Sequence, residues 1–245
     1  MILKHGGLFF FLLIVSFSLL AQDELSWKEA SRESQAYHAY RLKLTIPPYG
    51  LEKIKTKLKG LKRNDDEETK LSSAYYQSLS LREKFTYHMI HAESYSQNCD
   101  AMPPIQDEQK KIFGHLPDVF NEYRWSDGQI KFFKTNKDSV ISLMKESIAR
   151  TGRIGLNFKA AIAELNAMEM IPVLIGTYQS SKKDRDILTV LMLLMKENKY
   201  APFVSSASYK KLYGDEDNYL AALTYNTANE ELIIKRATEF SQGLK

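Results

Sequence analysis

The chain has 245 residues, a formal net charge of +4 and 44% hydrophobic residues. This composition is typical of a globular protein with a buried core and argues against a disordered chain, and the small basic excess gives no indication of nucleic-acid binding. Cys99 is the only cysteine, which excludes a disulfide bond within the chain.

The first residues have the features of a secretory signal peptide. Lys4 and His5 precede an uncharged apolar run at residues 8–20. This run of about 13 residues is shorter than the roughly 20 that a membrane-spanning helix needs. We therefore expect cleavage of residues 1–21, export to the periplasm or beyond, and no remaining transmembrane span, with a short uncleaved anchor as the alternative. Cleavage removes Lys4 and no acid, which lowers the formal charge from +4 to +3.

A helix followed by an extended segment is predicted next. Residues 25–40 have helical apolar spacing, and residues 40–46 then alternate apolar and polar side chains. Because no other stretch offers a strand partner, we expect this segment to lie extended against helices. Pro47, Pro48 and Gly50 end it in a turn.

Residues 51–63 predict a basic amphipathic helix, with Leu51, Ile54 and Leu58 on its apolar side. A solvated surface helix is the favoured interpretation, because the apolar stripe is narrow and the acidic run at 64–68 follows at once. Attachment to an anionic membrane surface is the alternative.

A capped helix and a loop follow. Ser80 and Glu83 have the capping-box spacing ahead of a helix over residues 81–91, and a proline-containing loop at 103–104 then interrupts the regular structure. We therefore expect an N-terminal helical region at 22–104 and a helical-repeat region at 105–245. A single domain that contains both is the alternative.

The second region has clearer helical signals. Asp138 is expected to cap a helix that runs to Ala149. Residues 187–195 are apolar on all sides and predict a central buried helix rather than a membrane span. Thr227 and Glu230 repeat the capping-box spacing before the last helix.

A shift of thirty residues aligns this region with itself. Pro172 and Pro202 then coincide, and both suit the first turn of a helix. Repetition of this kind lets helix pairs stack and bury apolar faces that one pair leaves exposed. Chance similarity among amphipathic helices is the alternative. The aligned columns are Ile162, Met192 and Ala222; Leu165, Met195 and Tyr225; Val173, Phe203 and Ile233; and Leu174, Val204 and Ile234.

The sequence AAIAELNAMEMIPVLI at residues 160–175 resembles the helix-break-helix core of a HEAT-like repeat, and residues 190–204 resemble it less well. The period of thirty is shorter than the roughly 40–47 residues usual for that family. The resemblance implies an α-solenoid or compact helical-repeat fold used for binding, and it assigns no catalytic residue. We therefore predict an all-α fold with stacked helix pairs in the C-terminal half.

Residue types that bind metals or act as nucleophiles gather at His88, His91, Glu93 and Cys99. Zinc accepts histidine, carboxylate and thiolate ligands, and a thiolate beside an imidazole is a nucleophile. The two histidines are not spaced as in H-E-x-x-H, however, and no second motif completes a site. A metal-binding protein or secreted hydrolase is therefore the alternative function. The favoured interpretation is structural, and no metal and no cofactor are expected.

Aromatic and basic side chains indicate where a binding groove would lie. The candidate groove residues are Tyr87, Tyr95, Arg124, Trp125, Arg150 and Arg153. No nucleophile elbow, phosphate loop or dinucleotide fingerprint occurs. The sequence therefore favours an exported helical protein that binds an envelope or extracellular protein or glycan.

Overall fold

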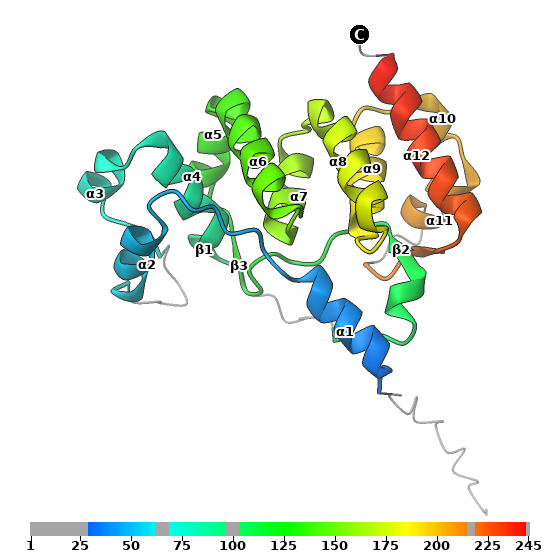
Figure 1. Ribbon diagram of the computed structural model, residues 1–245, viewed down its shortest axis with the longest axis horizontal. Helices are drawn as coiled ribbons and strands as arrows, with labels where there is room; N and C mark the ends of the chain where they lie inside the picture. The colour runs from blue at the N-terminus through cyan, green and yellow to red at the C-terminus, as the bar shows by residue number, and fades with distance from the viewer. Residues whose placement is uncertain (1–28, 62–68, 97–102, 215–218, 244–245) are drawn as a thin grey trace, which may run out of the picture.

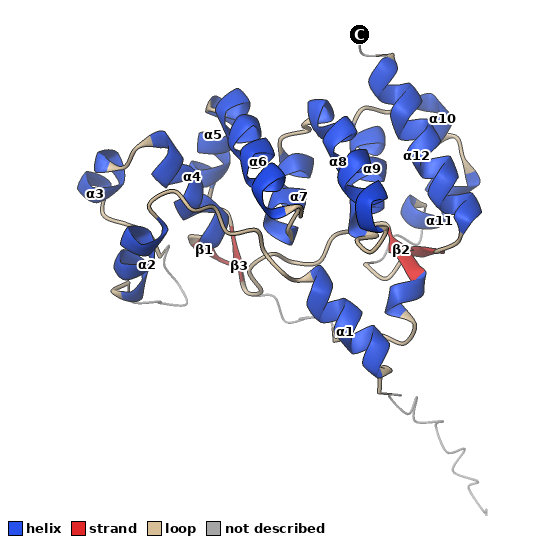
Figure 2. Cartoon of the chain, viewed as in Figure 1, coloured by secondary structure: helices blue, strands red, loops and turns tan. Residues whose placement is uncertain are grey.

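A computed structural model describes residues 29–61, 69–96, 103–214 and 219–243. The predicted signal peptide and Cys99 lie outside these ranges, as does the acidic loop at 215–217. In the described part the fold is mostly helical, and two antiparallel pairs of very short strands accompany the helices (Figures 1 and 2). The prediction of an all-α fold is confirmed.

The helices form two groups along the chain, one before and one after the first three strands. The first four are α1 (Arg32–Arg41), α2 (Leu51–Lys59), α3 (Ser73–Ser78) and α4 (Leu81–Ile90). The later ones are α5 (Asp127–Thr135), α6 (Lys137–Thr151), α7 (Leu156–Glu164), α8 (Ile171–Ser181), α9 (Asp186–Glu197), α10 (Ala201–Val204), α11 (Ala207–Tyr213) and α12 (Thr227–Gln242). The strand pairs are β1 (Ser94–Tyr95) with β3 (Tyr123–Arg124), and β2 (Lys111–Phe113) with β4 (Ala222–Thr224).

Helix α9 lies at the centre of the main core, as its uniformly apolar sequence predicts. It packs against α7, α8, α10 and α12, and its apolar side chains from Ile187 to Met195 are almost all fully buried. Phe85 and Met89 of α4 belong to the same core. The N-terminal region therefore contributes to the hydrophobic cluster that α9 organises. None of the helices in the described part of the chain combines the length and apolar content that a bilayer crossing requires.

Of three helix N-caps predicted from the sequence, one is confirmed and two are wrong. The capping box of Ser80 and Glu83 is present, with both reciprocal hydrogen bonds. Helix α6 instead begins one residue before Asp138, which lies in its first turn and does not cap it. Helix α12 is capped by Asn226, whose side chain accepts a hydrogen bond from the Asn229 N–H, so the expected Thr227 capping box is wrong.

The thirty-residue repeat is not confirmed. Pro172 and Pro202 both lie in the first turn of a helix that follows a break, but α8 has 11 residues and α10 has only 4. The preceding helices α7 and α9 end alike, with left-handed residues at Asn166 and Lys199. A short 3-10 helix, Met168–Met170, follows only the first of these ends. A shift that superposes the end of α7 on the end of α9 therefore does not superpose Pro172 on Pro202.

A smaller core holds the first helices together. Ile54 of α2 is fully buried, and it forms this core with Leu71, Leu79 and Tyr87. The apolar side of α2 thus packs inside the protein, which leaves its lysines as a solvated face. This arrangement agrees with the favoured interpretation of residues 51–63 and removes the apolar face that a membrane-bound helix would use.

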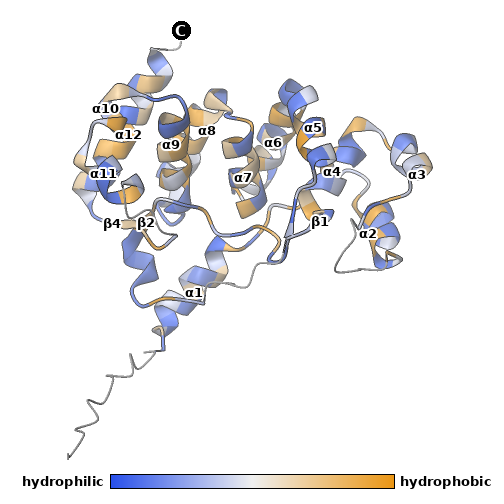
Figure 3. Cartoon of the chain, turned by 180° about the vertical axis from the view of Figure 1, so that it is seen from behind, coloured by the Kyte–Doolittle hydropathy of each residue, from blue (hydrophilic) through white to orange (hydrophobic). Residues whose placement is uncertain are grey.

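Residues 29–47 form a separate feature, which we call the N-terminal arm. Helix α1 lies below the row of later helices, and an extended stretch connects it across their ends to α2 (Figure 1). The arm is largely hydrophilic along α1, whereas apolar residues concentrate on the later helices (Figure 3). The extended conformation after α1 is as predicted, and it involves no strand of a sheet.

Candidate functional site

The predicted histidine region folds into a network of hydrogen bonds between α4 and α5. The His88 ring contacts Gln129 Nε2 through Nδ1 and the Tyr76 hydroxyl through Nε2, both at 2.9 Å. Because an amide nitrogen only donates, Nδ1 is the acceptor and Nε2 carries the proton. Trp125 also donates to the His88 carbonyl at 2.7 Å. The ring is therefore held in one tautomer by internal partners.

Burial determines the charge state of His88. Its side chain is almost completely buried, and burial, followed by the nearby His91 and Lys84, lowers its pKa to about 3. Burial, followed by the nearby Glu93, raises the pKa of Tyr76 to about 12. Both partners are thus neutral near pH 7. Neither pKa lies near the working pH, where general acid–base catalysis is most efficient.

Glu93 and His91 have partners of their own. The Glu93 carboxylate accepts hydrogen bonds from Tyr87 at 2.7 Å and Ser126 at 2.5 Å, and the His91 ring contacts the Thr69 carbonyl. His88, His91 and Glu93 therefore lie close together without converging on one point. Among the described residues no group of three or more histidine, cysteine, aspartate or glutamate side chains is arranged to hold a metal.

The six candidate groove residues fall into four places. Tyr87 is fully buried and lines no surface, while Trp125 is half-buried against Phe133. Tyr95 and Arg124 lie on the β1–β3 pair. Only Arg150 and Arg153 share a surface that holds a peptide, and this peptide is the protein's own arm.

Arg150, Arg153, Gly155, Leu156 and Asn157 hold the extended part of the arm, and we call them the cradle. They lie at the end of α6 and the start of α7, and most of their contacts are to main-chain atoms. Arg153 donates to the Tyr40 carbonyl at 2.7 Å, Leu156 N–H to the Lys43 carbonyl at 3.0 Å, and Arg150 to the Ile46 carbonyl at 3.3 Å.

Thr45 makes the densest contacts with the cradle. The Asn157 side chain accepts from the Thr45 N–H at 2.9 Å and donates to its carbonyl at 2.8 Å, as a neighbouring strand would. Gly155 N–H donates to the Thr45 hydroxyl at 2.7 Å. A Cβ atom at Gly155 would collide with the Thr45 backbone, so glycine is required for this close approach.

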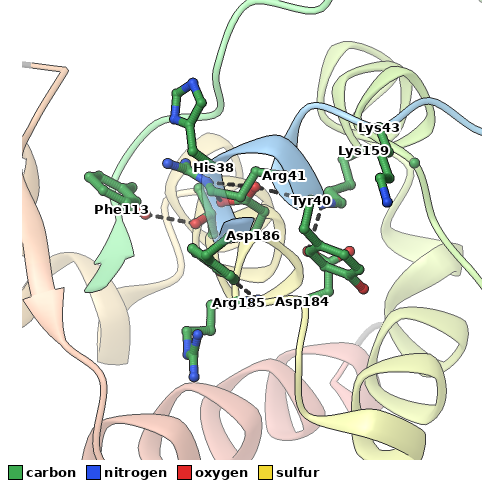
Figure 4. Close-up of polar contacts among 12 residues, drawn as sticks. His38, Tyr40, Arg41, Lys43, Phe113, Lys159, Asp184, Arg185 and Asp186 are labelled. Atoms are coloured by element: carbon green, nitrogen blue, oxygen red, sulfur yellow. Dashed lines mark hydrogen bonds and ion pairs between the residues drawn. The ribbon is translucent and has the colours of Figure 1, made fainter. Parts of the chain in front are cut away.

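Beside the cradle, α1 is attached through six charged or titratable side chains, which we call the ionic cluster (Figure 4). Arg41 donates from Nε to both carboxylate oxygens of Asp186 at 3.0 Å, and from Nη1 to Glu108 at 2.6 Å. Its guanidinium carbon lies 4.1 Å from the centre of the Phe113 ring. Lys159, fully buried, donates to Asp184 at 2.6 Å. The cluster consists of His38, Arg41, Glu108, Lys159, Asp184 and Asp186.

The two aspartates of this cluster respond differently to burial. For Asp186, burial would raise the pKa, but Arg41 and Lys159 outweigh it and hold the pKa below its usual value. For Asp184, burial exceeds the attraction of Lys159 and raises the pKa, and its Oδ2 accepts no hydrogen bond within the described part of the chain. Arg41 is therefore the group that keeps Asp186 ionised.

The ionic cluster is absent from the sequence-based candidates, although the sequence contains a signal for it. Lys159 is a single charge inside an apolar helical run, whereas Asp186 ends a run of charged residues directly before one. Such charges are rarely fully buried unless they are paired. Arg41 pairs with Asp186, and Glu108 pairs with Arg41. Both come from stretches far from Asp186 in the sequence, so only the fold brings the cluster together.

Comparison of the chain with protein-family models, with curated proteins and with solved structures found no match in any of the three. The fold and the site together define a mostly helical protein whose own N-terminal arm lies in the cradle.

Proposed function

We propose that this is an exported, non-catalytic helical protein that binds another protein of the envelope or the extracellular space. The signal-peptide pattern at residues 1–21 supports export. The cradle supports protein binding, because it already holds an extended peptide.

The observation that carries this proposal is the chemistry of the cradle contacts. Asn157 binds both the N–H and the carbonyl of Thr45, and Leu156, Arg150 and Arg153 bind further carbonyls. Groups that bind successive amides and carbonyls recognise the polypeptide main chain. A glycan offers hydroxyl groups with no such repeat, so the cradle favours a protein partner.

Site-specific photocrosslinking in cells that express the full chain tests this proposal. A photoreactive amino acid replaces Ile46, which lies at the cradle and is 39% exposed, and in a matched control it replaces Leu232 of α12, which is 38% exposed. The expected result is a protease-sensitive adduct of discrete mass from position 46 only, formed by a chain that has lost residues 1–21. Retention of the full chain in the cytoplasm, or adducts that resist protease and contain glycan, would contradict it.

A further inference from the structure

The attachment of the N-terminal arm is mainly polar. The buried residues of α1 are Ser34 and Arg41, and neither adds apolar surface to the core. Tyr37 accepts a hydrogen bond from the Arg185 N–H at 3.2 Å, and Ser34 donates to Gln109 at 2.8 Å. Release of the arm would therefore expose charges and hydrogen-bonding groups rather than a large apolar face.

The arm is also held as a peptide ligand is held. Its main chain is bound at Tyr40, Lys43, Thr45 and Ile46, and the two buried residues between positions 40 and 46 are Arg41 and Thr45. The Arg41 side chain enters a buried pocket formed by Asp186, Glu108 and Phe113.

The second buried position is Thr45, whose hydroxyl accepts from Gly155. The side chain of Leu42 is 37% exposed, and that of Ile46 is 39% exposed, so these positions contribute little selectivity. The site therefore recognises a segment in which an arginine ends a helix and a threonine follows four residues later in extended chain. A bidentate arginine–carboxylate contact supplies affinity and geometric selectivity together.

From this geometry we propose that the cradle and the Asp186–Glu108–Phe113 pocket form a peptide-binding site that accepts, in place of the arm, a segment of the protein partner that passes from a helix end into extended chain. The segment carries arginine four residues before threonine. This inference rests on the proposed function and specifies the chemistry of the partner.

The arm competes with such a partner. A covalently attached segment has an effective concentration in the millimolar range, so a free peptide of similar sequence displaces it poorly. A chain with a weakened arm and an intact receptor site is therefore the appropriate protein for the test. Arg41→Ala and Thr45→Val change only the arm.

The experiment measures binding of a fluorescein-labelled peptide of residues 36–47, AYHAYRLKLTIP, to full mature chains by fluorescence anisotropy. We expect saturable binding to the Arg41→Ala chain and binding at least about tenfold weaker to the wild-type chain. The same peptide with alanine in place of its arginine should bind the Arg41→Ala chain at least about tenfold more weakly than the original. If Arg41→Ala does not fold by circular dichroism, the Thr45→Val chain replaces it.

Absence of saturable binding to a folded arm-weakened chain would overturn the inference. Equal binding of the peptides with and without arginine would also overturn it. Light scattering identifies the source of the segment. A dimer that forms by exchange of arms and requires Arg41 would assign the segment to a second copy and contradict a separate partner.

The two proposals fail separately. Loss of peptide binding together with a retained photocrosslink from position 46 would remove the peptide site and leave the proposed function standing. Peptide binding without any crosslinked protein in cells would remove the proposed function and leave the peptide site standing.

Discussion

Arg41 is the residue on which attachment of the arm depends most. It forms ion pairs with both Asp186 and Glu108, and all three side chains are buried. Burial would raise the pKa of Asp186, and Arg41 together with Lys159 holds it below its usual value. Removal of one partner of a buried ion pair leaves an uncompensated charge in the interior.

We predict that Arg41→Ala lowers the free energy of unfolding by about 3–5 kcal/mol, measured by urea denaturation at pH 7. Arg82→Ala is the matched control, because Arg82 pairs with Glu146 at the surface and both side chains are about half exposed. It should change stability much less. Equal effects of the two substitutions would show that the ionic cluster does not secure the arm.

His88 should make the protein sensitive to acid. Its pKa is about 3 in the folded protein, below the usual 6.5, so the unfolded chain binds the proton more readily. The stability that its neutral form contributes is present above about pH 6.5 and is lost as pH falls toward 3, by up to about 1.4 kcal/mol per pH unit.

The variant His88→Gln should therefore flatten the pH dependence of unfolding between pH 6.5 and 4, measured by urea titration at several pH values. His115→Gln is the matched substitution, because it replaces a partly buried histidine that lies beside Tyr213 and outside the His88 network. An unchanged slope in His88→Gln would contradict a buried neutral imidazole.

At the scale of single elements, helix α12 shows how a cap can be assigned one residue away from its true position. Asn226 is the N-cap, and the Glu230 carboxylate accepts from Tyr225 at 3.0 Å and pairs with Lys182 at 2.8 Å. The sequence pattern at Thr227 has the right spacing, but the tertiary contacts use Glu230 elsewhere.

Replacement of Asn226 by alanine should lower the free energy of unfolding by about 1 kcal/mol, because the Asn229 N–H loses its acceptor. Thr227→Ala should have less than about half that effect, because Thr227 makes no capping contact. Thermal or urea unfolding of the two variants distinguishes them. A larger loss from Thr227→Ala would restore the capping box that the sequence predicts.

Local signals in the sequence predicted elements well where a few neighbouring residues determine them. The Ser80–Glu83 box and the apolar helix α9 are examples. The thirty-residue period was less informative, because apolar helices of similar length align without equivalent connections. The extra 3-10 turn before α8 shifts Pro172 relative to the end of α7, and composition alone does not reveal it.

For the molecule as a whole, long-range pairing limited what the sequence could predict of the site. The sequence predicts Arg150 and Arg153 as groove candidates, but their partner is the arm, more than a hundred residues earlier in the chain. Arg41 and Asp186 are similarly distant. Such pairs depend on the path of the arm across the helices, which no local pattern encodes.

The arrangement also accounts for stability without a disulfide bond. One large core around α9 and a smaller one around Ile54 supply the apolar burial, and the arm adds polar contacts across their edge. The arm and the body therefore differ in the kind of interaction that holds them, and regions with few buried apolar contacts open more easily than a core.

Hydrogen exchange of the full mature chain, followed by mass spectrometry, tests this central claim most directly. The amides of residues 32–46 should exchange through an opening that leaves α9 protected, so the arm becomes labelled well before the core. Loss of protection in the arm and in α9 at the same rate, as one cooperative unit, would contradict the account of a separable arm bound in a peptide-holding cradle.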